Sequence, residues 1–512
     1  MQTAYQLVWL AKERTPNQIA LVDDQTDRKL TYAELIKEVD IVAAGLHERG
    51  IGQGDRVATI LPSLFDHCVT ILALQRIAAV PAMINFRLTP KEIVEILSDG
   101  GMKGVISLPD PTVTNAVREC LPDNGLILTV GEAVDKSEAL SVCRGEIASL
   151  PCPIVTPDDP AFIFYTSGTT GLPKGVILNH GSSEPRVIWL STQAGLRHGT
   201  HNRALGFMPL SHVIGFYGVF LVTLALNGTY YVMSTFDPVK AVDAVEKHRI
   251  TFMFAVPQLY FAMAQAPNYS PAKVQSTELL LYGGAAIDSE FLSQMDQEWA
   301  GTIRHIYGTT ETMCSMYNPN PVGNHRRLRP GFYTRMRVIR IDGGIEDLVS
   351  PGEEGELIVD VNQDTIFAEY LNRPDATAAK VRDGWYFTGD VCLLHSDGDV
   401  DLIGRTDDMI RSGGENVEPS EIEVILNGHS GVKEAVVIGV PDKKWGEVVT
   451  ACVVGDALLP DDLDKYIKAS ALAPFKRPRR YLFIDRIPRN AANKVLRREL
   501  QSLAKKSVLI KV

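Results

Sequence analysis

The sequence is short of paired cysteines and of positive charge. Its 512 residues contain seven cysteines, an odd number, and no CxxC or Cys/His ligand pattern links them. This favours small buried thiols in a reducing cytoplasm over a disulfide framework or a metal cluster. The net charge of −11 argues against general nucleic-acid binding, which needs a basic footprint.

Segments typical of membrane targeting or insertion are also missing. The first residues lack the basic region and apolar core that mark a signal peptide. The most apolar run, residues 213–226, has about 14 residues and stops at Asn227-Gly228. It is too short to cross a bilayer, so it predicts a buried helix before a turn and no membrane partner.

Local signals place helices and strands in the first hundred residues. Thr31 and Thr89 each open a capping box with a glutamate three residues later, which predicts a helix after each. Apolar runs at 56–61, 81–84 and 104–108 predict strands. Strands that alternate with helices of this length predict right-handed βαβ units and buried parallel sheets.

The same alternation returns in the middle of the chain and then gives way to two other patterns. The strands expected in the middle are residues 204–208, 229–233, 252–256, 279–282 and 304–307. After about residue 336, short strands between turn residues predict a β-rich, barrel-like subdomain. The last hundred residues or so read as a compact α+β unit.

These patterns predict an α/β fold with two domains, since a chain of 512 residues is too long for one core. A large N-terminal domain of stacked βαβ sheets, with the β-rich subdomain, is expected over residues 1–404. A hinge follows at 405–408, near Asp407. A small, mobile α+β domain is expected over residues 409–512.

The loop at residues 166–175 has the chemistry of a phosphate cradle. It follows an apolar run at 161–164 and combines hydroxyl side chains, glycines and a lysine. Glycines let backbone N–H groups approach an anion, hydroxyls add donors and lysine adds a charge. It is not a Walker A loop, because no Gly-Lys-Ser/Thr ends it. By itself it is equally consistent with a mobile surface turn.

Further motifs occur in a fixed order and decide between these interpretations. They are Tyr165-Thr166-Ser167-Gly168-Thr169-Thr170-Gly171-Leu172-Pro173-Lys174-Gly175, Tyr307-Gly308-Thr309-Thr310-Glu311, Tyr386-Phe387-Thr388-Gly389-Asp390, Gly404-Arg405-Thr406-Asp407-Asp408, Ser412-Gly413-Gly414-Glu415-Asn416 and Asn493-Lys494. With them, nearly the whole chain resembles the adenylate-forming (AMP-binding) acyl-CoA synthetases. Residues 190–199 and 476–481 are most similar to bacterial aryl-CoA ligases of the 4-chlorobenzoate:CoA ligase type.

The resemblance implies a ligase that uses ATP, Mg²⁺ and coenzyme A. A carboxylic acid would attack the α-phosphorus of ATP to form an acyl-adenylate and pyrophosphate, and the CoA thiol would then displace AMP. The partners expected are small molecules, with no nucleic acid and no membrane. A homodimer is one assembly open to the chain.

The resemblance also implies which residues bind the nucleotide. Thr310 is expected on the α-phosphate, Glu311 on Mg²⁺ and Asp390 on the ribose hydroxyls. Arg405 is expected nearby, on the ribose or a phosphate. The phosphate-binding set is Thr166, Ser167, Gly168, Thr169, Thr170 and Lys174, and the adenine slot is Gly283, Gly284, Ala285 and Tyr307. The glycines are equally explained by a tight turn at a strand end.

The catalytic lysine and the CoA site are expected near the C-terminus. Lys494 matches the lysine that bridges the attacking carboxylate and the α-phosphate, although Arg489, Arg497 and Arg498 allow a plain solvated basic face. Residues 471–512 are rich in lysine and arginine, with only Asp485 and Glu499 as acids. The CoA set implied by the resemblance is Arg87, Arg477 and Arg479 for phosphates, Trp445 for adenine, and Gly413 and Gly414 for the pantetheine tunnel. A solvated face is the alternative for each charged member.

The acyl pocket implied by the resemblance is apolar. Its members are Trp189, Val213, Ile214, Phe254, Ile306, Met313 and Cys314, with His212 as a gate beside the reacting carboxylate or as a core histidine. Chlorobenzoate enzymes carry Phe at Trp189 and Asn at Cys314, which argues against chlorobenzoate itself. A benzoate-type acid is expected first and a small aliphatic or alicyclic acid second. A stand-alone enzyme that loads a carrier protein is a further alternative.

Overall fold

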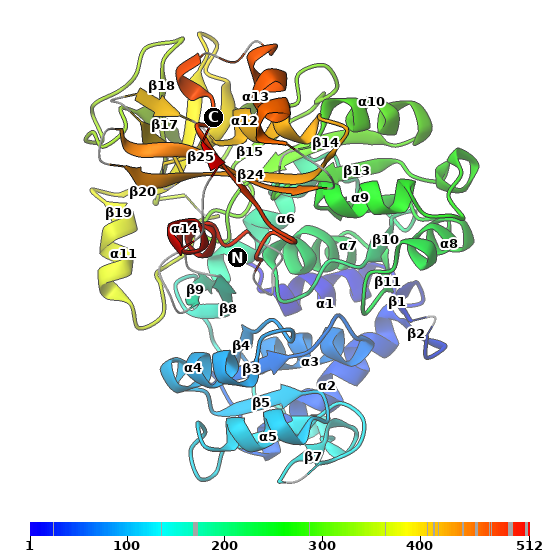
Figure 1. Ribbon diagram of the computed structural model, residues 1–512. Helices are drawn as coiled ribbons and strands as arrows, with labels where there is room; N and C mark the ends of the chain where they lie inside the picture. The colour runs from blue at the N-terminus through cyan, green and yellow to red at the C-terminus, as the bar shows by residue number, and fades with distance from the viewer. Residues whose placement is uncertain are drawn as a thin grey trace. The chain divides into compact units, whose positions relative to one another are not determined.

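The chain divides into two units in the computed structural model (Figure 1), and each is described separately. One unit contains Met1–Arg335 and Asp360–Gly384, and the other contains Met336–Val359 and Trp385–Val512. The residues described are 1–23, 25–134, 136–166, 173–285, 287–363, 365–406, 408–412, 415–417, 419–442, 445–455, 459–470, 472, 474–489, 495–506 and 510–511. The α/β fold expected from the sequence is confirmed, whereas the domain boundaries at 404 and 408 stay predictions.

The first unit contains a mostly parallel sheet of seven strands, β3 to β9. Its strand order is β7 (Glu138–Ala139), β6 (Leu126–Thr129), β5 (Gly104–Ser107), β3 (Arg56–Ile60), β4 (Val80–Met83), β8 (Pro160–Thr166) and β9 (Lys174–Asn179). Helices α4 (Pro90–Gly100) and α5 (Pro111–Arg118) cover one face (Figure 1), where Ile93, Ile96 and Val117 join the apolar core of these strands. The predicted βαβ alternation is confirmed here.

The last two strands of this sheet form a hairpin around the phosphate-loop motif. β8 and β9 run antiparallel, and Thr166 lies opposite Lys174. The sequence predicted β8 but not the return strand β9. The motif therefore lies in a strand–loop–strand connection, unlike the strand–loop–helix of a P-loop.

A second sheet of the same unit carries the other predicted strands. Its order is β16 (Arg327–Pro330), β15 (Met316–Asn318), β14 (Thr302–Tyr307), β13 (Leu279–Tyr282), β12 (Phe252–Ala255), β10 (Arg203–Gly206), β11 (Thr229–Val232), β1 (Ile19–Asp23) and β2 (Arg28–Thr31). β10 to β14 are parallel. Helices α8 (Pro238–His248), α9 (Pro257–Ala264) and α10 (Ser289–Glu298) pack on one face (Figure 1).

The capping boxes and the buried helix occur where the sequence predicts them. Thr31 and Thr89 both accept from the backbone N–H three residues on, at the starts of α2 (Tyr32–Glu48) and α4. The apolar run at 213–226 is helical and buried over most of its length, although Ile214–Leu221 is wound as a π-helix before α7 (Val222–Ala225). None of the helices within the described residues is long and apolar enough to span a membrane.

The second unit contains the predicted β-rich segment and the predicted α+β unit. β17 (Met336–Ile339) pairs antiparallel with β18 (Glu354–Asp360), and β20 (Trp385–Leu394) pairs antiparallel with β21 (Val400–Arg405). In the α+β part, β24 (Val432–Asp442), β25 (Gly446–Gly455) and β26 (Arg480–Phe483) lie side by side.

Helices cover both faces of this small sheet. Ile422 and Leu426 of α12 (Pro419–Asn427) and Leu463 of α13 (Pro460–Lys468) join the core on one face. Leu500 and Ala504 of α14 (Arg497–Lys506) join the core on the other. The apolar stripe of α14 is thus buried, while Arg498, Lys505 and Lys506 are exposed.

Candidate active site

The ends of the phosphate-loop motif are fixed by strand pairing. Thr166 ends β8 and Lys174 begins β9, and the Thr166 hydroxyl is 3.5 Å from the carbonyl oxygen of Lys174. At Gly175 an added Cβ would lie 3.2 Å from the Cβ of Leu371, so a neighbouring segment packs directly on the hairpin. Ser167, Gly168, Thr169 and Thr170 lie outside the described residues.

Two other predicted loops leave neighbouring parallel strands at their carboxyl ends. Tyr282 of β13 is in register with His305 of β14, so the loops that begin at Gly283 and Gly308 start side by side. A Cβ at Gly283 would lie 2.4 Å from the Ile306 carbonyl oxygen. This is the edge at which open α/β sheets bind ligands. A glycine at 283 is required by this close approach of the neighbouring strand, whereas its predicted place in the adenine slot stays a prediction.

The carboxylate of Glu311 is buried beside the end of the phosphate loop. Tyr370 donates from its hydroxyl to Oε1 of Glu311 at 2.7 Å, and the Phe367 N–H donates to the Glu311 carbonyl oxygen at 2.7 Å. The Tyr370 ring centroid is 5.1 Å from Nζ of Lys174. Tyr370 thus brings together two of the three predicted loops.

The second carboxylate oxygen of Glu311 is suited to a hard cation. Glu311 is 8% exposed, and within the described residues neither a basic side chain nor a hydrogen-bond donor contacts its Oε2. A buried carboxylate without such a partner is costly, and Mg²⁺ commonly binds one protein carboxylate together with nucleotide phosphates. Glu311 therefore fits the magnesium ligand expected from the sequence.

Several predicted acyl-pocket residues surround the Gly283–Gly284 turn. A Cβ at Gly283 would lie 3.4 Å from the Phe254 ring, and one at Gly284 would lie 3.8 Å from Cδ1 of Ile214. Phe254 and Ile306 are buried. Gly283 and Gly284 of the predicted adenine slot thus lie next to apolar residues of the predicted acyl wall, whereas the parts expected of Ala285 and Tyr307 stay predictions.

Another part of the acyl wall packs around Trp189 on α6 (Ser183–Thr192). Trp189 is fully buried, its ring is 6.0 Å from that of Tyr317, and its Nε1 would be 2.3 Å from a Cβ at Gly331. Met313 and Cys314 are buried in the loop after β14, and Met313 has φ of 54°. Burial raises the pKa of the Cys314 thiol to about 12, so the thiol stays neutral.

His212 and Arg87 lie within electrostatic reach of each other. His212 begins the turn of helix that contains Val213, and its carbonyl oxygen accepts from the Phe216 N–H at 3.0 Å. Burial lowers the pKa of His212, and the positive charge of Arg87 lowers it further. Both effects favour the neutral imidazole of His212, and its role as a gate stays a prediction.

In the second unit, Asp390 and Arg405, both expected near the nucleotide, form an ion pair that the sequence did not predict. Arg405 donates from Nη1 to Oδ1 of Asp390 at 2.7 Å and from Nη2 to the Thr388 carbonyl oxygen at 3.2 Å. Their strands β20 and β21 place them directly opposite each other. Asp390 is 6% exposed, whereas the Arg405 side chain is 34% exposed, so the ion pair is buried on the carboxylate side and meets solvent on the guanidinium side.

The predicted CoA residues of the second unit separate into two groups. The Arg479 guanidinium lies 4.4 Å from the Trp445 ring centroid, which is a cation–π geometry. It brings together the side chain predicted to contact the CoA phosphates and the side chain predicted to contact the adenine. Arg477 instead lies 3.1 Å from Oδ1 of the buried Asp464. The Asp464 carboxylate already compensates the positive charge of Arg477, so this ion pair competes with phosphate binding.

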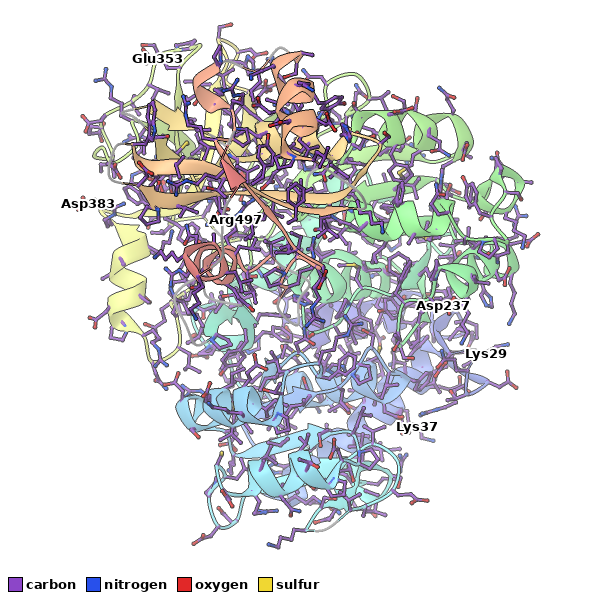
Figure 2. All side chains as sticks on the ribbon, viewed as in Figure 1. Lys29, Lys37, Asp237, Glu353, Asp383 and Arg497 are labelled. Carbon is purple, nitrogen blue, oxygen red and sulfur yellow. The ribbon has the colours of Figure 1, made fainter. Side chains whose placement is uncertain are left out.

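Lys494, Gly413 and Gly414 lie outside the described residues, as does Asp407 of the predicted hinge. The neighbours of Lys494 can be described. Arg497 (labelled in Figure 2) lies 2.9 Å from Glu423, and Arg489 pairs with Glu434. The sequence also allowed a solvated basic face that would include Arg489 and Arg497. In the structure, both of these side chains are instead held in ion pairs.

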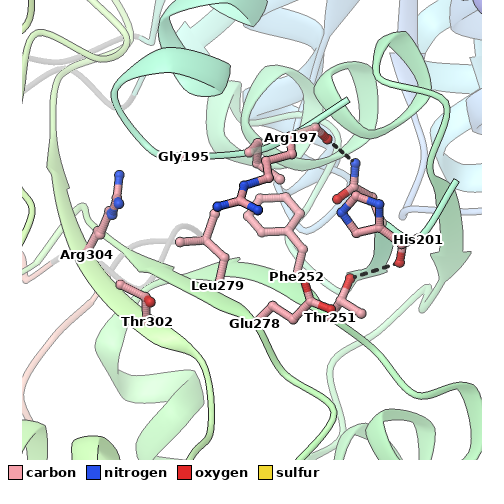
Figure 3. Close-up of a pocket in the computed structure, with 11 residues that line it drawn as sticks. Gly195, Arg197, His201, Thr251, Phe252, Glu278, Leu279, Thr302 and Arg304 are labelled. Carbon is pink, nitrogen blue, oxygen red and sulfur yellow. Dashed lines mark hydrogen bonds between the residues drawn. The ribbon is translucent and has the colours of Figure 1, made fainter. Parts of the chain in front are cut away.

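A surface cavity of about 310 Å³ lies at the opposite strand edge (Figure 3). Its walls include Phe252, Leu279 and Thr302, at the amino ends of β12, β13 and β14, together with Arg197 and Arg304. None of the predicted site residues lines it. We therefore place the candidate active site at the carboxyl ends of the strands and not in this cavity.

Sequence reasoning missed two residues near the candidate site. No local sequence pattern marks Tyr370, because its backbone pairs with β9, a strand that is distant in the sequence. Arg186 on α6 is 1% exposed, donates to the Thr365 carbonyl oxygen at 2.7 Å and lies 4.8 Å from the Tyr217 ring centroid. Burial lowers its pKa. Its position one turn before Trp189 is the only sequence signal that connects it to the acyl wall.

Comparisons with known proteins identify the family of the chain. Residues 8–371 match the AMP-binding enzyme family, and residues 421–494 match the AMP-binding enzyme C-terminal domain. The chain is 44% identical to a 4-chlorobenzoate–CoA ligase of Arthrobacter sp., over 98% of this chain and 95% of that protein. It is 34% identical to a feruloyl-CoA synthase of Amycolatopsis sp., over 92% and 93%.

Solved structures show the same fold. ATP-bound MatB from Rhodopseudomonas palustris has a TM-score of 0.86 and 27% identity, covering 98% of this chain and 99% of that one. The o-succinylbenzoate CoA synthetase MenE of Bacillus subtilis, in complex with ATP and magnesium, has a TM-score of 0.84 and 26% identity, with the same coverage. Taken with the motifs and the Glu311 site, the chain belongs to the AMP-binding enzyme family and is an ATP-dependent acid–CoA ligase.

Proposed function

We propose that this ligase activates a compact, apolar, benzoate-type acid. The observation that carries the proposal is the apolar character of the predicted acyl wall, in which Trp189, Phe254, Ile306 and Met313 are all buried. Val213 adds to it, because it offers no acid for the ammonium of an amino-acid substrate. The name of the 44% identical relative, a 4-chlorobenzoate–CoA ligase, supports the same substrate class.

The first step joins the acid to AMP. The carboxylate attacks the α-phosphorus of ATP, pyrophosphate leaves, and the mixed anhydride gives the acyl group a good leaving group. Two anions must approach each other, so the site has to offset their repulsion. We assign this to Lys494 and Thr310 at the α-phosphate. Lys174 and the hydroxyls of the phosphate loop would hold the departing pyrophosphate.

Glu311 would hold Mg²⁺, which shields charge on the phosphate oxygens when it is bound. Asp390 has two carboxylate oxygens, one of which is used by Arg405, and it would accept from the ribose hydroxyls.

In the second step the CoA thiol attacks the acyl carbon and AMP leaves. We assign the CoA phosphates to Arg87 and Arg479, and to Arg477 if its pairing with Asp464 opens. Trp445 would stack on adenine, and Gly413 and Gly414 would leave room for the thiol arm.

The two steps would share one site through rotation of the C-terminal domain about Asp407, a movement that hinge residues absorb in φ and ψ. We also propose a cytoplasmic location, since all seven cysteines are free thiols. A homodimer stays a prediction.

A panel of carboxylic acids, scored by AMP release with CoA present, tests the proposed substrate. We expect benzoates with small apolar substituents to give the highest kcat/KM. Higher values for alicyclic or short aliphatic acids would replace the benzoate assignment with the second candidate. AMP release that depends on a carrier protein instead of CoA would contradict the CoA-ligase step.

A further inference from the structure

Tyr370 occupies a position between two charged groups of the phosphate site. Its hydroxyl donates to Oε1 of Glu311 at 2.7 Å, and the face of its ring lies 5.1 Å from the ammonium of Lys174. Tyr370 is 3% exposed and Glu311 is 8% exposed, so the hydrogen bond forms away from bulk water. A hydrogen bond to a charged group in such a setting is stronger than one at the surface.

The backbone around Tyr370 is fixed to the phosphate-loop hairpin. The Leu371 N–H donates to the Gly175 carbonyl oxygen at 2.7 Å, and the Ile177 N–H donates to the Glu369 carbonyl oxygen at 3.0 Å. Val176 and Tyr370 form an antiparallel bridge. Residues 369–371 therefore extend the hairpin by a short paired segment, and any shift of Tyr370 would require β9 to move as well.

The same segment also holds the backbone of Glu311. The Phe367 N–H donates to the Glu311 carbonyl oxygen at 2.7 Å. Glu311 is thus fixed at its carbonyl group and at one carboxylate oxygen by residues 367 and 370. Its other carboxylate oxygen is the one left for a cation, and the orientation of the carboxylate plane is set by the phenol.

We propose that Tyr370 is a positioning residue for the magnesium carboxylate. It rests on the proposed role of Glu311 as the ligand for Mg²⁺ of MgATP. The phenol orients the carboxylate through Oε1, so that Oε2 would be the oxygen available to Mg²⁺, and the ring helps to position the Lys174 ammonium. Partners of this kind, which hold a metal ligand without touching the metal, typically change metal affinity about 10- to 100-fold when removed.

Tyr370→Phe tests the proposal, because it removes the hydroxyl and keeps the ring under Lys174. We expect the Mg²⁺ concentration for half-maximal ATP–pyrophosphate exchange to rise about tenfold. By calorimetry, MgATP binding should weaken by a similar factor, while binding of ATP in EDTA should stay at the wild-type value. The rate of thioester formation from supplied acyl-adenylate should also be unchanged.

A matched control is Tyr260→Phe. Tyr260 is also buried in the first unit, and its hydroxyl donates to the Leu281 carbonyl oxygen at 2.9 Å, away from the phosphate site. It should lower the melting temperature without moving the Mg²⁺ midpoint. Tyr370→Phe should also have no further effect on that midpoint in a Glu311→Ala background, because the carboxylate it positions is gone.

The proposal is overturned if Tyr370→Phe leaves the Mg²⁺ midpoint unchanged, or if it weakens metal-free ATP binding as much as MgATP binding. An equal shift in the Glu311→Ala background would also overturn it. Failure of the proposed function would look different, because the wild-type chain would then give no acid-dependent pyrophosphate exchange at all.

Discussion

Arg405 holds Asp390 by a hydrogen bond of 2.7 Å from Nη1 to Oδ1, across the paired strands β20 and β21. The arginine therefore fixes the orientation of the carboxylate through Oδ1. A ribose that uses Asp390 must bind beside the guanidinium, which fixes the side of the carboxylate from which nucleotide approaches.

Asp390→Asn should weaken ATP binding more than it slows turnover. The amide keeps the size of the side chain but removes the charge that attracts Arg405 and the ribose hydroxyls. Hydrogen bonds to charged groups contribute about 1.5–3 kcal/mol, so KM for ATP should rise about 10- to 100-fold. Steady-state kinetics check this. Asp401→Asn is the control, because Asp401 lies on β21 and pairs with His395 at 3.0 Å instead. Equal effects of the two variants would contradict the assignment.

Lys494→Ala should separate the two half-reactions. Without the ammonium, the carboxylate and the α-phosphate repel each other, so single-turnover adenylate formation should fall by about 100-fold or more. Thioester formation from supplied acyl-adenylate should keep its rate, since that step involves no approach of two anions. Lys505→Ala, in α14, is the control for loss of one positive charge. An equal loss in both half-reactions would remove Lys494 from the catalytic role.

Trp189→Phe should shift substrate preference toward bulkier acids. The indole is fully buried against Tyr317 and Gly331, so a smaller ring leaves space in the predicted acyl wall. We expect the ratio of kcat/KM for a para-substituted benzoate to that for benzoate to rise about tenfold. Trp299→Phe is the control, because Trp299 is also buried but packs against Tyr260 in the core beside α10. A matching shift in that variant would show a general effect of core packing.

Arg479→Ala should impair use of CoA only. The guanidinium lies over Trp445, and its loss removes a candidate phosphate contact without touching the acyl wall. KM for CoA should rise about tenfold, whereas ATP–pyrophosphate exchange should be unchanged. Lys465→Ala, on α13 and exposed, is the matched control. A change in pyrophosphate exchange with no change in KM for CoA would assign Arg479 to the first step.

His67 should make the first unit less stable in acid. Both ring nitrogens have partners within the core, Pro62 at 3.0 Å and Thr59 at 3.1 Å, and burial lowers the pKa of His67 to about 4 from 6.5. Below pH 6.5 the unfolded chain takes up a proton that the folded chain excludes. The free energy of unfolding therefore falls as pH drops from 6.5 toward 4, by about 2 kcal/mol at pH 5.

His67→Gln removes this titration, so its urea midpoint should change less between pH 7.5 and pH 5 than the wild-type midpoint does. The exposed His201, replaced by Gln, serves as the control. An unchanged pH response in His67→Gln would show that other groups, such as His180 and His305, account for the acid sensitivity; burial lowers the pKa of each to about 4.

Local signals in the sequence were enough to place most elements. The capping boxes at Thr31 and Thr89 and the apolar runs of β3, β12 and β13 depend on neighbouring residues, so these helices and strands appear where predicted. β9 was missed, because it follows a loop rich in glycine and threonine and its pairing partner lies before that loop. The order of strands within each sheet could not be predicted either, since it depends on contacts between residues that are far apart in the sequence.

The site was predictable only through the family motifs. Outside the family motif, nothing in the local sequence distinguishes Glu311 from a solvated loop acid. Burial of its carboxylate depends on Tyr370, which lies fifty-nine positions away in the sequence. The resemblance placed Asp390 and Arg405 near the nucleotide, but their ion pair became visible only in the structure. Lys494 cannot be told from its basic neighbours by sequence pattern, and the ion pairs of Arg489 and Arg497 become visible only in three dimensions.

The division of the chain has a practical consequence for truncated proteins. The first unit is discontinuous, because the chain leaves it after Arg335 and returns at Asp360 for one further stretch, to Gly384. That stretch includes Tyr370, which donates to Glu311. A fragment ended at residue 335 would lose the phenol together with the second unit. Expression of the first unit alone therefore calls for a spliced gene that joins residue 335 to residue 360 through a short linker.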